Sequence, residues 1–256
     1  MQTTTDHLLD QQVTLIQPQT GYRVAIDPVL LAAAIPAPPR KNGFMLDLGA
    51  GVGAVGLCAL YHHPHAQLTM VEKMPELCAL AAKNIIVNHR QDHANIIEAD
   101  ITQPAIKQQL TAGYYSNIML NPPFFKESQA TPSQNMRKAV AHIMPDNDFI
   151  AWLDLAHACC KHKGVISMIL PPNRARLALN YFYKLPCTQT ILPIHPFADK
   201  PANRIILHIK KTGTEDFTLL SPLILHDNRA RYPNHHPDRK RYRDQVDMIL
   251  AGKIRL

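Results

Sequence analysis

The chain has 256 residues, 46% of them hydrophobic, and carries a formal net charge of +7 with a pI of about 9.2. This size and composition predict one globular α/β domain, and no apolar run is long enough to span a bilayer, so we expect no membrane partner. The positive charge favours a polyanionic partner without identifying it. Five cysteines without a CxxC spacing indicate reduced thiols, and the N-terminus lacks a signal-peptide pattern, so we expect a cytoplasmic protein.

The first 41 residues read as an extension ahead of the main sheet. Met1–Asp10 is polar and is expected to fray, whereas Val13–Gln17 alternates like a short strand. Asp27 followed by Pro28 is a strong helix start, with Asp27 as the N-cap of an apolar helix. Pro36–Lys41 is expected to link this helix to the sheet.

Strands and helices alternate through the middle of the chain. Apolar runs predict four strands, at Phe44–Leu48, Leu68–Glu72, Asn95–Asp100 and Asn117–Leu120. Helical patterns lie between them, at Ala54–Tyr61, Pro75–Asn88 and Pro104–Leu110. This order predicts a parallel sheet with right-handed crossovers and helices on both faces.

The last part of the chain begins with a polar stretch, Phe125–Asn147, which reads as a long loop of functional type. The pattern then predicts a helix, a strand and another helix, at Asp148–Lys161, Gly164–Leu170 and Pro171–Tyr183. Two final strands are expected as an antiparallel pair, followed by a short helix, at Gln189–Pro193, Arg204–Lys210 and Tyr242–Leu250.

Glycines after the first central strand predict a nucleotide-type ligand. The spacing Gly51-x-Gly53-x-x-Gly56 matches the dinucleotide fingerprint and by itself permits an NAD enzyme. Asp47 argues against that ligand, because a carboxylate so close to the loop would repel a pyrophosphate. S-adenosylmethionine carries a sulfonium and an amino group, which favour nearby acceptors. The tighter pattern Asp47-x-Gly49-x-Gly51-x-Gly53 therefore favours this cofactor.

Acids also end the next two predicted strands. Glu72 is placed to hold ribose hydroxyls and Asp100 to accept from an adenine amine. One acid at a strand end is ordinarily an exposed carboxylate. Three at the ends of three successive strands form a site, because the carboxyl ends of parallel strands meet at one edge.

Asn121-Pro122-Pro123-Phe124 follows the fourth strand and carries the second half of the predicted site. Asn121 supplies an amide oxygen and Pro122 a carbonyl, both hydrogen-bond acceptors, while Phe124 supplies a flat apolar face. The two prolines end the strand and stiffen the turn. Two acceptors beside an aromatic plane suit an exocyclic amine on a planar base. The alternative is a rigid turn with a core phenylalanine.

These motifs resemble the class I S-adenosylmethionine-dependent methyltransferases that methylate amino groups. The stretch Gly21–Leu31, Ala202-Asn203-Arg204 and the tail from Tyr242 to Gly252 resemble, more narrowly, the bacterial tRNA1(Val) adenine-37 N6-methyltransferase-like family over most of the chain. Phe124 stands where that family often has tyrosine, and it keeps the aromatic face. The resemblance implies a Rossmann-like fold with a mostly parallel seven-stranded sheet.

The resemblance also implies roles for individual residues. Residues 1–256 would form a single methyltransferase domain, with the extension at 1–41 and a basic tail at 226–256. S-adenosylmethionine would be the cofactor, a tRNA the substrate, and no metal is expected. Catalytic roles fall on Asn121, Pro122, Pro123 and Phe124. Cofactor-binding roles fall on Asp27, Asp47, Gly49, Gly51, Gly53, Glu72, Asp100 and Asn121.

Several alternatives remain open at this point. NPPF also occurs in ribosomal-RNA guanine N2-methyltransferases, and protein glutamine methyltransferases use a related NPPY site on an amide nitrogen. An NAD oxidoreductase and a non-catalytic RNA-binding domain are further candidates. Phosphates of an RNA would be held by basic residues after the motif and in the tail, with Arg137, Lys138, Arg229, Arg231, Arg239, Lys240, Arg241 and Arg243 as candidates. The sequence does not indicate the oligomeric state.

Overall fold

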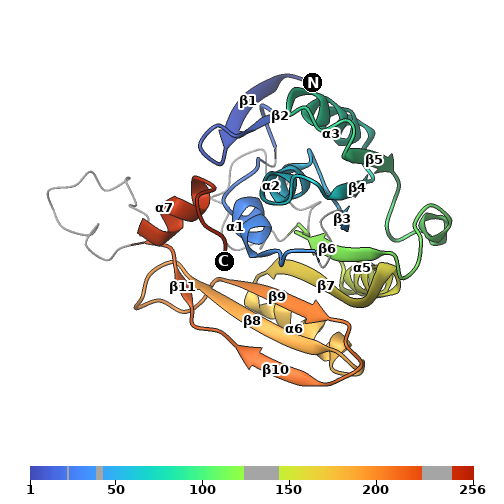
Figure 1. Cartoon of the computed structure of the whole chain (residues 1–256), viewed down its shortest axis with the longest axis vertical. Coiled ribbons are helices and arrows are strands. Elements are labelled where there is room, and N and C mark those ends of the chain that lie inside the picture. The colour runs from blue at the N-terminus through green and yellow to red at the C-terminus, as the bar shows by residue number, and fades with distance from the viewer. Residues whose placement is uncertain (22, 39–42, 124–143, 227–243) are drawn as a thin grey trace, which may run out of the picture.

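A computed structural model describes residues 1–21, 23–38, 43–123, 144–226 and 244–256. Its centre is one large sheet with helices on both faces (Figure 1). Seven strands lie side by side in the order β8-β9-β7-β6-β3-β4-β5, and among these β9 alone runs antiparallel to its neighbours. Their bounds are β3 Phe44–Leu48, β4 Gln67–Glu72, β5 Ala94–Glu98, β6 Tyr115–Leu120, β7 Cys160–Leu170, β8 Thr188–His195 and β9 Arg204–Lys210.

These seven strands confirm the predicted Rossmann-like class I methyltransferase fold. Two short strands extend the described sheet beyond the prediction, because β10 (Asp216–Leu219) and β11 (Leu223–Ile224) both pair with β8 in parallel. The expected antiparallel pairing of the last two long strands is present as β8 against β9. Strand β6 is buried along its whole length, as expected of a central parallel strand covered on both faces.

An apolar cluster lies on each face of the sheet. The first contains residues of α1 (Asp27–Ala34), α2 (Ala54–His62), α3 (Pro75–Val87) and α7 (Asp244–Leu250). The second contains residues of α5 (Asp146–Cys159) and α6 (Pro172–Phe182). Both clusters include side chains from the central strands, so the sheet has a packed core on each side.

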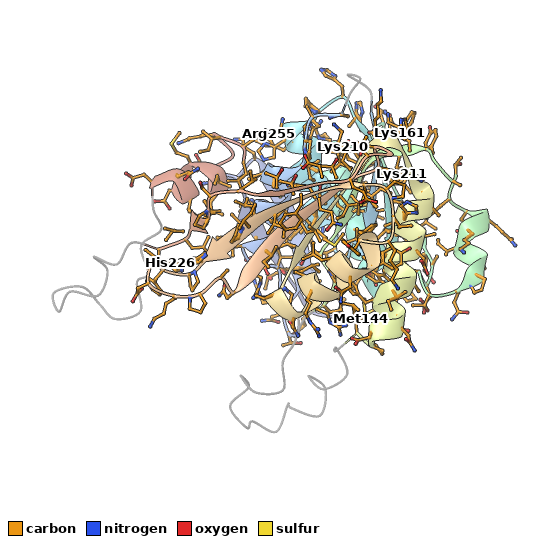
Figure 2. All side chains as sticks on the ribbon, turned by 90° about the horizontal axis from the view of Figure 1, so that it is seen from below. Met144, Lys161, Lys210, Lys211, His226 and Arg255 are labelled. Carbon is orange, nitrogen blue, oxygen red and sulfur yellow. The ribbon has the colours of Figure 1, made fainter. Side chains whose placement is uncertain are left out.

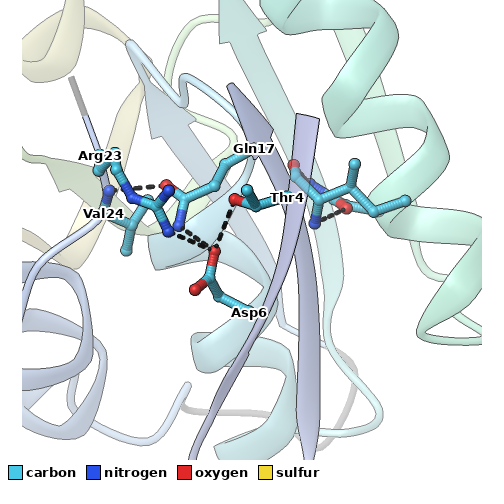
Figure 3. Close-up of polar contacts among 7 residues, drawn as sticks. Thr4, Asp6, Gln17, Arg23 and Val24 are labelled. Atoms are coloured by element: carbon cyan, nitrogen blue, oxygen red, sulfur yellow. Dashed lines mark hydrogen bonds and ion pairs between the residues drawn. The ribbon is translucent and has the colours of Figure 1, made fainter. Parts of the chain in front are cut away.

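The expectation that the first ten residues fray is wrong. Strand β1 (Thr3–Leu8) pairs antiparallel with β2 (Val13–Pro18), from Thr3 opposite Pro18 to Leu8 opposite Val13. A polar cluster holds this hairpin to the chain that leads to α1 (Figure 3). The Asp6 carboxylate accepts hydrogen bonds from Thr4, Gln17 and Arg23 at 3.1, 2.8 and 2.8 Å. Gln17 in turn accepts from the Val24 backbone N–H at 2.9 Å.

Several predicted boundaries shift. Helix α5 ends at Cys159 and β7 begins at Cys160, so the helix predicted to Lys161 was too long. The segment predicted as a helix from Pro104 is a 3-10 turn, Pro104–Gln108. Strand β5 ends at Glu98, two residues before Asp100. Asp27 is not the N-cap of α1 but lies in its first turn, and Ile26 is the N-cap.

The described residues contain five buried free thiols, in agreement with the expected reduced cysteines. No helix in the described part of the chain combines the length and apolar character needed to cross a membrane. Within the same residues no cluster of three histidine, cysteine or acidic side chains is arranged to hold a metal ion.

Candidate active site

Three of the predicted site residues, Gly49, Glu72 and Asn121, lie together at the carboxyl edge of the sheet. Leu48 at the end of β3 is paired with Val71 of β4 and with Leu120 of β6. The residues that follow in register are therefore Glu72 on one side of Gly49 and Asn121 on the other. The sequence analysis depends on this adjacency, because the predicted site requires Asn121 to lie beside the glycine loop.

The loop after β3 has the conformation that its glycines allow. Gly49, Gly51 and Gly53 have φ angles of +73°, +58° and +89°, which side chains rarely adopt. The Gly49 and Ala50 N–H groups donate to the carbonyl of Val71 at 2.9 and 3.0 Å, which fixes the start of the loop against β4. A Cβ built on Gly51 would meet no protein atom within 4 Å, so the loop backbone is open to a ligand there.

Gly49 is confined for a different reason. A Cβ at this position would lie 2.1 Å from Cη2 of Trp152, because the indole of α5 packs directly against the loop. Trp152 is 8% exposed and belongs to the apolar cluster on the α5 side of the sheet. Trp152 is therefore a core residue, and its contact with the loop was not visible in the sequence.

Glu72 shapes the loop from the adjacent strand. Its Oε2 accepts from the Gly51 N–H at 2.9 Å, and its Oε1 accepts from the Lys73 and Met74 N–H groups, both at 2.9 Å. The residue is 7% exposed. Each carboxylate oxygen has more than one acceptor site, so a ligand hydroxyl at this edge can still bond to it.

Asp47 lies beneath the loop. It is 1% exposed, and its Oδ2 accepts from the Gly56 N–H in the first turn of α2 at 3.0 Å. Burial, with a smaller contribution from the charge of Glu72, raises the pKa of Asp47 to about 7 although the bond from Gly56 opposes the shift. The carboxyl that was expected to face a cofactor thus ties β3 to α2.

A pH-dependent contribution to stability follows from this buried acid. Because the folded-state pKa of Asp47 is higher than its unfolded value, the folded chain holds a proton that the unfolded chain has lost between about pH 4 and 7. The free energy of unfolding of the wild type should therefore fall relative to that of Asp47→Asn as pH rises through this window. Denaturant titrations of both proteins at several pH values measure the difference, and a constant difference would contradict the assignment.

Asp100 follows β5 by two residues and is held by a local turn. Its Oδ1 accepts from the Thr102 N–H at 2.8 Å and from the Thr102 hydroxyl at 2.7 Å. Partial burial alone would raise the pKa of Asp100, but the two bonds from Thr102 and the charge of Lys73 hold it below its usual range. The backbone just before Asp100 is bound to the end of β4, since the Ala99 N–H donates to the Glu72 carbonyl at 2.9 Å.

Asn121 directly follows β6 and is half-buried, while Pro122 is buried and Pro123 exposed. Among the described residues, none is hydrogen-bonded to the side-chain amide of Asn121. The amide is therefore free to bond to a ligand at this edge. Phe124 and the basic candidates in the loop and the tail lie outside the described residues.

Asp27 is engaged by another side chain of the protein. Its Oδ2 accepts from Nε of Arg204 at 2.8 Å, so the carboxylate predicted to contact a cofactor forms an ion pair in this structure. The pair joins the first turn of α1 to the first residue of β9.

Asn84 supports the site and was not identified from the sequence. It is fully buried in α3, and its Nδ2 donates to the carbonyls of Val52 and Ile16, both at 2.9 Å. Its Oδ1 accepts from the Ile16 N–H at 2.7 Å. One turn later Asn88 makes the same pair of bonds to Thr14, at 2.9 and 2.7 Å. The two amides thus take the place of a neighbouring strand along β2, and Asn84 also holds the glycine loop.

We expect Asn84→Ala to lower the free energy of unfolding by about 3 kcal/mol, because it leaves the buried carbonyl of Val52 and the half-buried N–H and carbonyl of Ile16 unpaired. It should also weaken cofactor binding, since Val52 lies between Gly51 and Gly53. Asn88→Ala is the matched control, because it loosens the hairpin without touching the loop. Calorimetric binding of S-adenosylmethionine to both variants separates the two effects, and equal affinities would contradict a role of Asn84 in the loop.

The chain is similar in sequence to known methyltransferases. Residues 23–148 match the family model described as methyltransferase small domain. A tRNA1(Val) (adenine(37)-N6)-methyltransferase of Shewanella sp. (strain MR-4) is 28% identical over 77% of this chain and 81% of its own. The protein of the same name from Shewanella woodyi is 32% identical over 59% of this chain and 60% of its own.

Solved structures share the fold at lower identity. A predicted O-methyltransferase from Agrobacterium tumefaciens superposes with a TM-score of 0.69 at 21% identity, over 90% of this chain and 98% of its own. TYW2 of P. horikoshii, solved in complex with MeSAdo, gives a TM-score of 0.55 at 12% identity, over 83% and 72% of the two chains. At these identities the likeness establishes the fold.

Proposed function

We propose that this chain, which has the class I methyltransferase fold and resembles the bacterial tRNA1(Val) (adenine(37)-N6)-methyltransferases, methylates N6 of an adenine in tRNA with S-adenosylmethionine. The observation that carries the proposal is the position of Asn121, which is next in register to Gly49 on the side opposite Glu72 and has a side-chain amide that forms no hydrogen bond with a described residue. The whole chain would act as one cytoplasmic enzyme.

The residues at the sheet edge suit this cofactor. The open backbone at Gly51 allows close approach, and Gly49 and Gly53 keep the turn that makes this approach possible. Glu72 would accept from the ribose hydroxyls and Asp100 from the adenine amine. Asp47 would act from below the loop by fixing Gly56. When bound, S-adenosylmethionine supplies an activated methyl group on a sulfonium.

Asn121 and Pro122 would prepare the nucleophile. The exocyclic amine of adenine is a poor nucleophile because its lone pair is delocalised into the ring. Asn121 Oδ1 and the Pro122 carbonyl would each accept a hydrogen bond from one N–H of this amine. These two bonds favour a pyramidal nitrogen, whose lone pair is no longer delocalised into the ring. These acceptors gain strength as positive charge develops on the nitrogen, so they stabilise the transition state more than the ground state.

The remaining motif residues would position the base. Pro123 stiffens the turn after the acceptors, and Phe124 would stack on an adenine turned out of its loop. The basic residues of the loop and the tail would neutralise RNA phosphates, which predicts steep weakening of RNA binding with salt.

Mass spectrometry of nucleosides tests the proposal. Unmodified tRNA transcripts would be incubated with the enzyme and methyl-labelled S-adenosylmethionine, and digested to nucleosides. We expect label in N6-methyladenosine. Label in N2-methylguanosine would assign the activity to a guanine instead. No label in any nucleoside, together with no calorimetric binding of S-adenosylmethionine, would indicate a non-catalytic domain.

A further inference from the structure

The ion pair between Arg204 and Asp27 links residues 177 positions apart. Two bonds fix the guanidinium: Nε donates to Asp27 at 2.8 Å, and Nη1 donates to the Asn203 carbonyl at 2.9 Å. The Asp27 side chain is 16% exposed and that of Arg204 is 35% exposed. Among the described residues nothing is bonded to Nη2, so a pre-oriented cation keeps donors free toward solvent.

Strand register puts this cation on the catalytic edge. Leu120 pairs with Met168 across β6 and β7, and Leu170 pairs with Ile205 across β7 and β9. Strand β9, which begins at Arg204, lies two strands away from β6, which Asn121 follows. Arg204 is therefore roughly 10 Å from Asn121 across the sheet and about 7 Å further outward along the strands.

Both side chains also belong to the same face. Alternating residues of β6 and β9 contribute Met119 and Ile206 to the apolar cluster that contains α1. Side chains two residues apart on a strand point to the same face. Asn121, two residues after Met119, and Arg204, two residues before Ile206, therefore belong to this face as well. The cation thus lies beyond Asn121, on the side away from Glu72 and the glycine loop.

We propose that Arg204 binds a backbone phosphate of the RNA next to the target adenine, with Asp27 as the residue that orients it. This inference rests on the proposed function, since it requires a nucleotide base at Asn121. A guanidinium held through Nε presents its remaining N–H groups as a fork that matches two phosphate oxygens. Phosphate contacts of this kind set the register of a nucleic acid, and Arg204 would thereby position the adenine for Asn121.

The first test measures RNA binding as a function of salt. Arg204→Gln should weaken binding of an unmodified tRNA transcript by about ten-fold, the loss expected for one charged hydrogen-bonding group. The slope of log Kd against log salt should become shallower by about one. Binding of S-adenosylmethionine should be unchanged.

Lys210→Gln is the matched control for net charge. Strand β9 begins at Arg204 and ends at Lys210, so the two residues lie at opposite ends of the strand. Figure 2 shows Lys210 on the side of the molecule opposite Met144, which precedes α5. Lys210 is exposed, and none of the ion pairs among the described residues includes it. We expect it to leave the Kd for RNA within about two-fold of the wild type, because its charge lies far from the catalytic edge.

The second test uses synthetic stem-loops in which single phosphates next to the target adenine are replaced by neutral methylphosphonates. At the contacted phosphate the neutral linkage should weaken binding to the wild type but not further weaken binding to Arg204→Gln. An unchanged salt slope, or equal effects of every neutral linkage on both proteins, would overturn the inference and leave adenine methylation intact. A wild type that labels no RNA adenine would overturn both.

Discussion

Asn121→Ala is expected to slow methyl transfer by about 10²–10³-fold, the usual cost of losing one preorganised polar group that stabilises a transition state. The structure supports a loss in the chemical step, because Asn121 lies beside the glycine loop and contributes no hydrogen bond from its amide to the described fold. The free energy of unfolding should therefore be little changed. Single-turnover rates with saturating tRNA and S-adenosylmethionine measure the effect.

Asn180→Ala, an exposed asparagine of α6, is the matched control and should keep the wild-type rate. The affinities of Asn121→Ala for tRNA and for the cofactor should stay near those of the wild type, since the acceptor acts mainly in the transition state. A single-turnover rate close to that of the wild type would remove Asn121 from the mechanism.

Gly49→Ala should lower the free energy of unfolding by about 3–5 kcal/mol, since it adds overpacking in the core to the strain of a positive φ. The new methyl would overlap the Trp152 ring at 2.1 Å, and the ring is held in the apolar cluster beneath it. Urea titration measures this loss. A double-mutant cycle with Trp152→Ala should show favourable coupling, because the smaller residue removes the overlap.

Gly51→Ala is the informative comparison. Its φ of +58° carries a strain of about 1–2 kcal/mol, but its Cβ would meet no protein atom. This variant should fold and yet bind S-adenosylmethionine weakly, because the methyl enters the space that we assign to the cofactor. If Gly49→Ala and Gly51→Ala lowered the free energy of unfolding equally, the contact with Trp152 would not explain why position 49 requires glycine.

The elements that were predicted correctly have strong local patterns. The buried strands β3, β4 and β6 are short apolar runs followed by polar or glycine residues, and alternation with helices makes a parallel sheet the natural arrangement. Once the sheet is parallel, its strand ends share an edge. The neighbourhood of Gly49, Glu72 and Asn121 could therefore be predicted without coordinates.

The misassigned elements have weak local patterns and depend on distant partners. Strand β1 is polar, and its hairpin is held along β2 by Asn84 and Asn88, which lie 68 and 74 residues away from the backbone groups that they bind. Asp27 looked like a helix cap because its local sequence favours one, but the charge of Arg204 engages its carboxylate instead.

By itself the sequence determined the sheet, the glycine loop and the edge on which Asn121 stands, because periodicity and strand-end chemistry act over a few residues. Only the tertiary structure decided that Asp47 is buried beneath the loop, that Trp152 confines Gly49 and that Arg204 pairs with Asp27 at the carboxyl edge of the sheet. These contacts arise when separate elements pack against one another, and no short window of sequence records which side chains then meet.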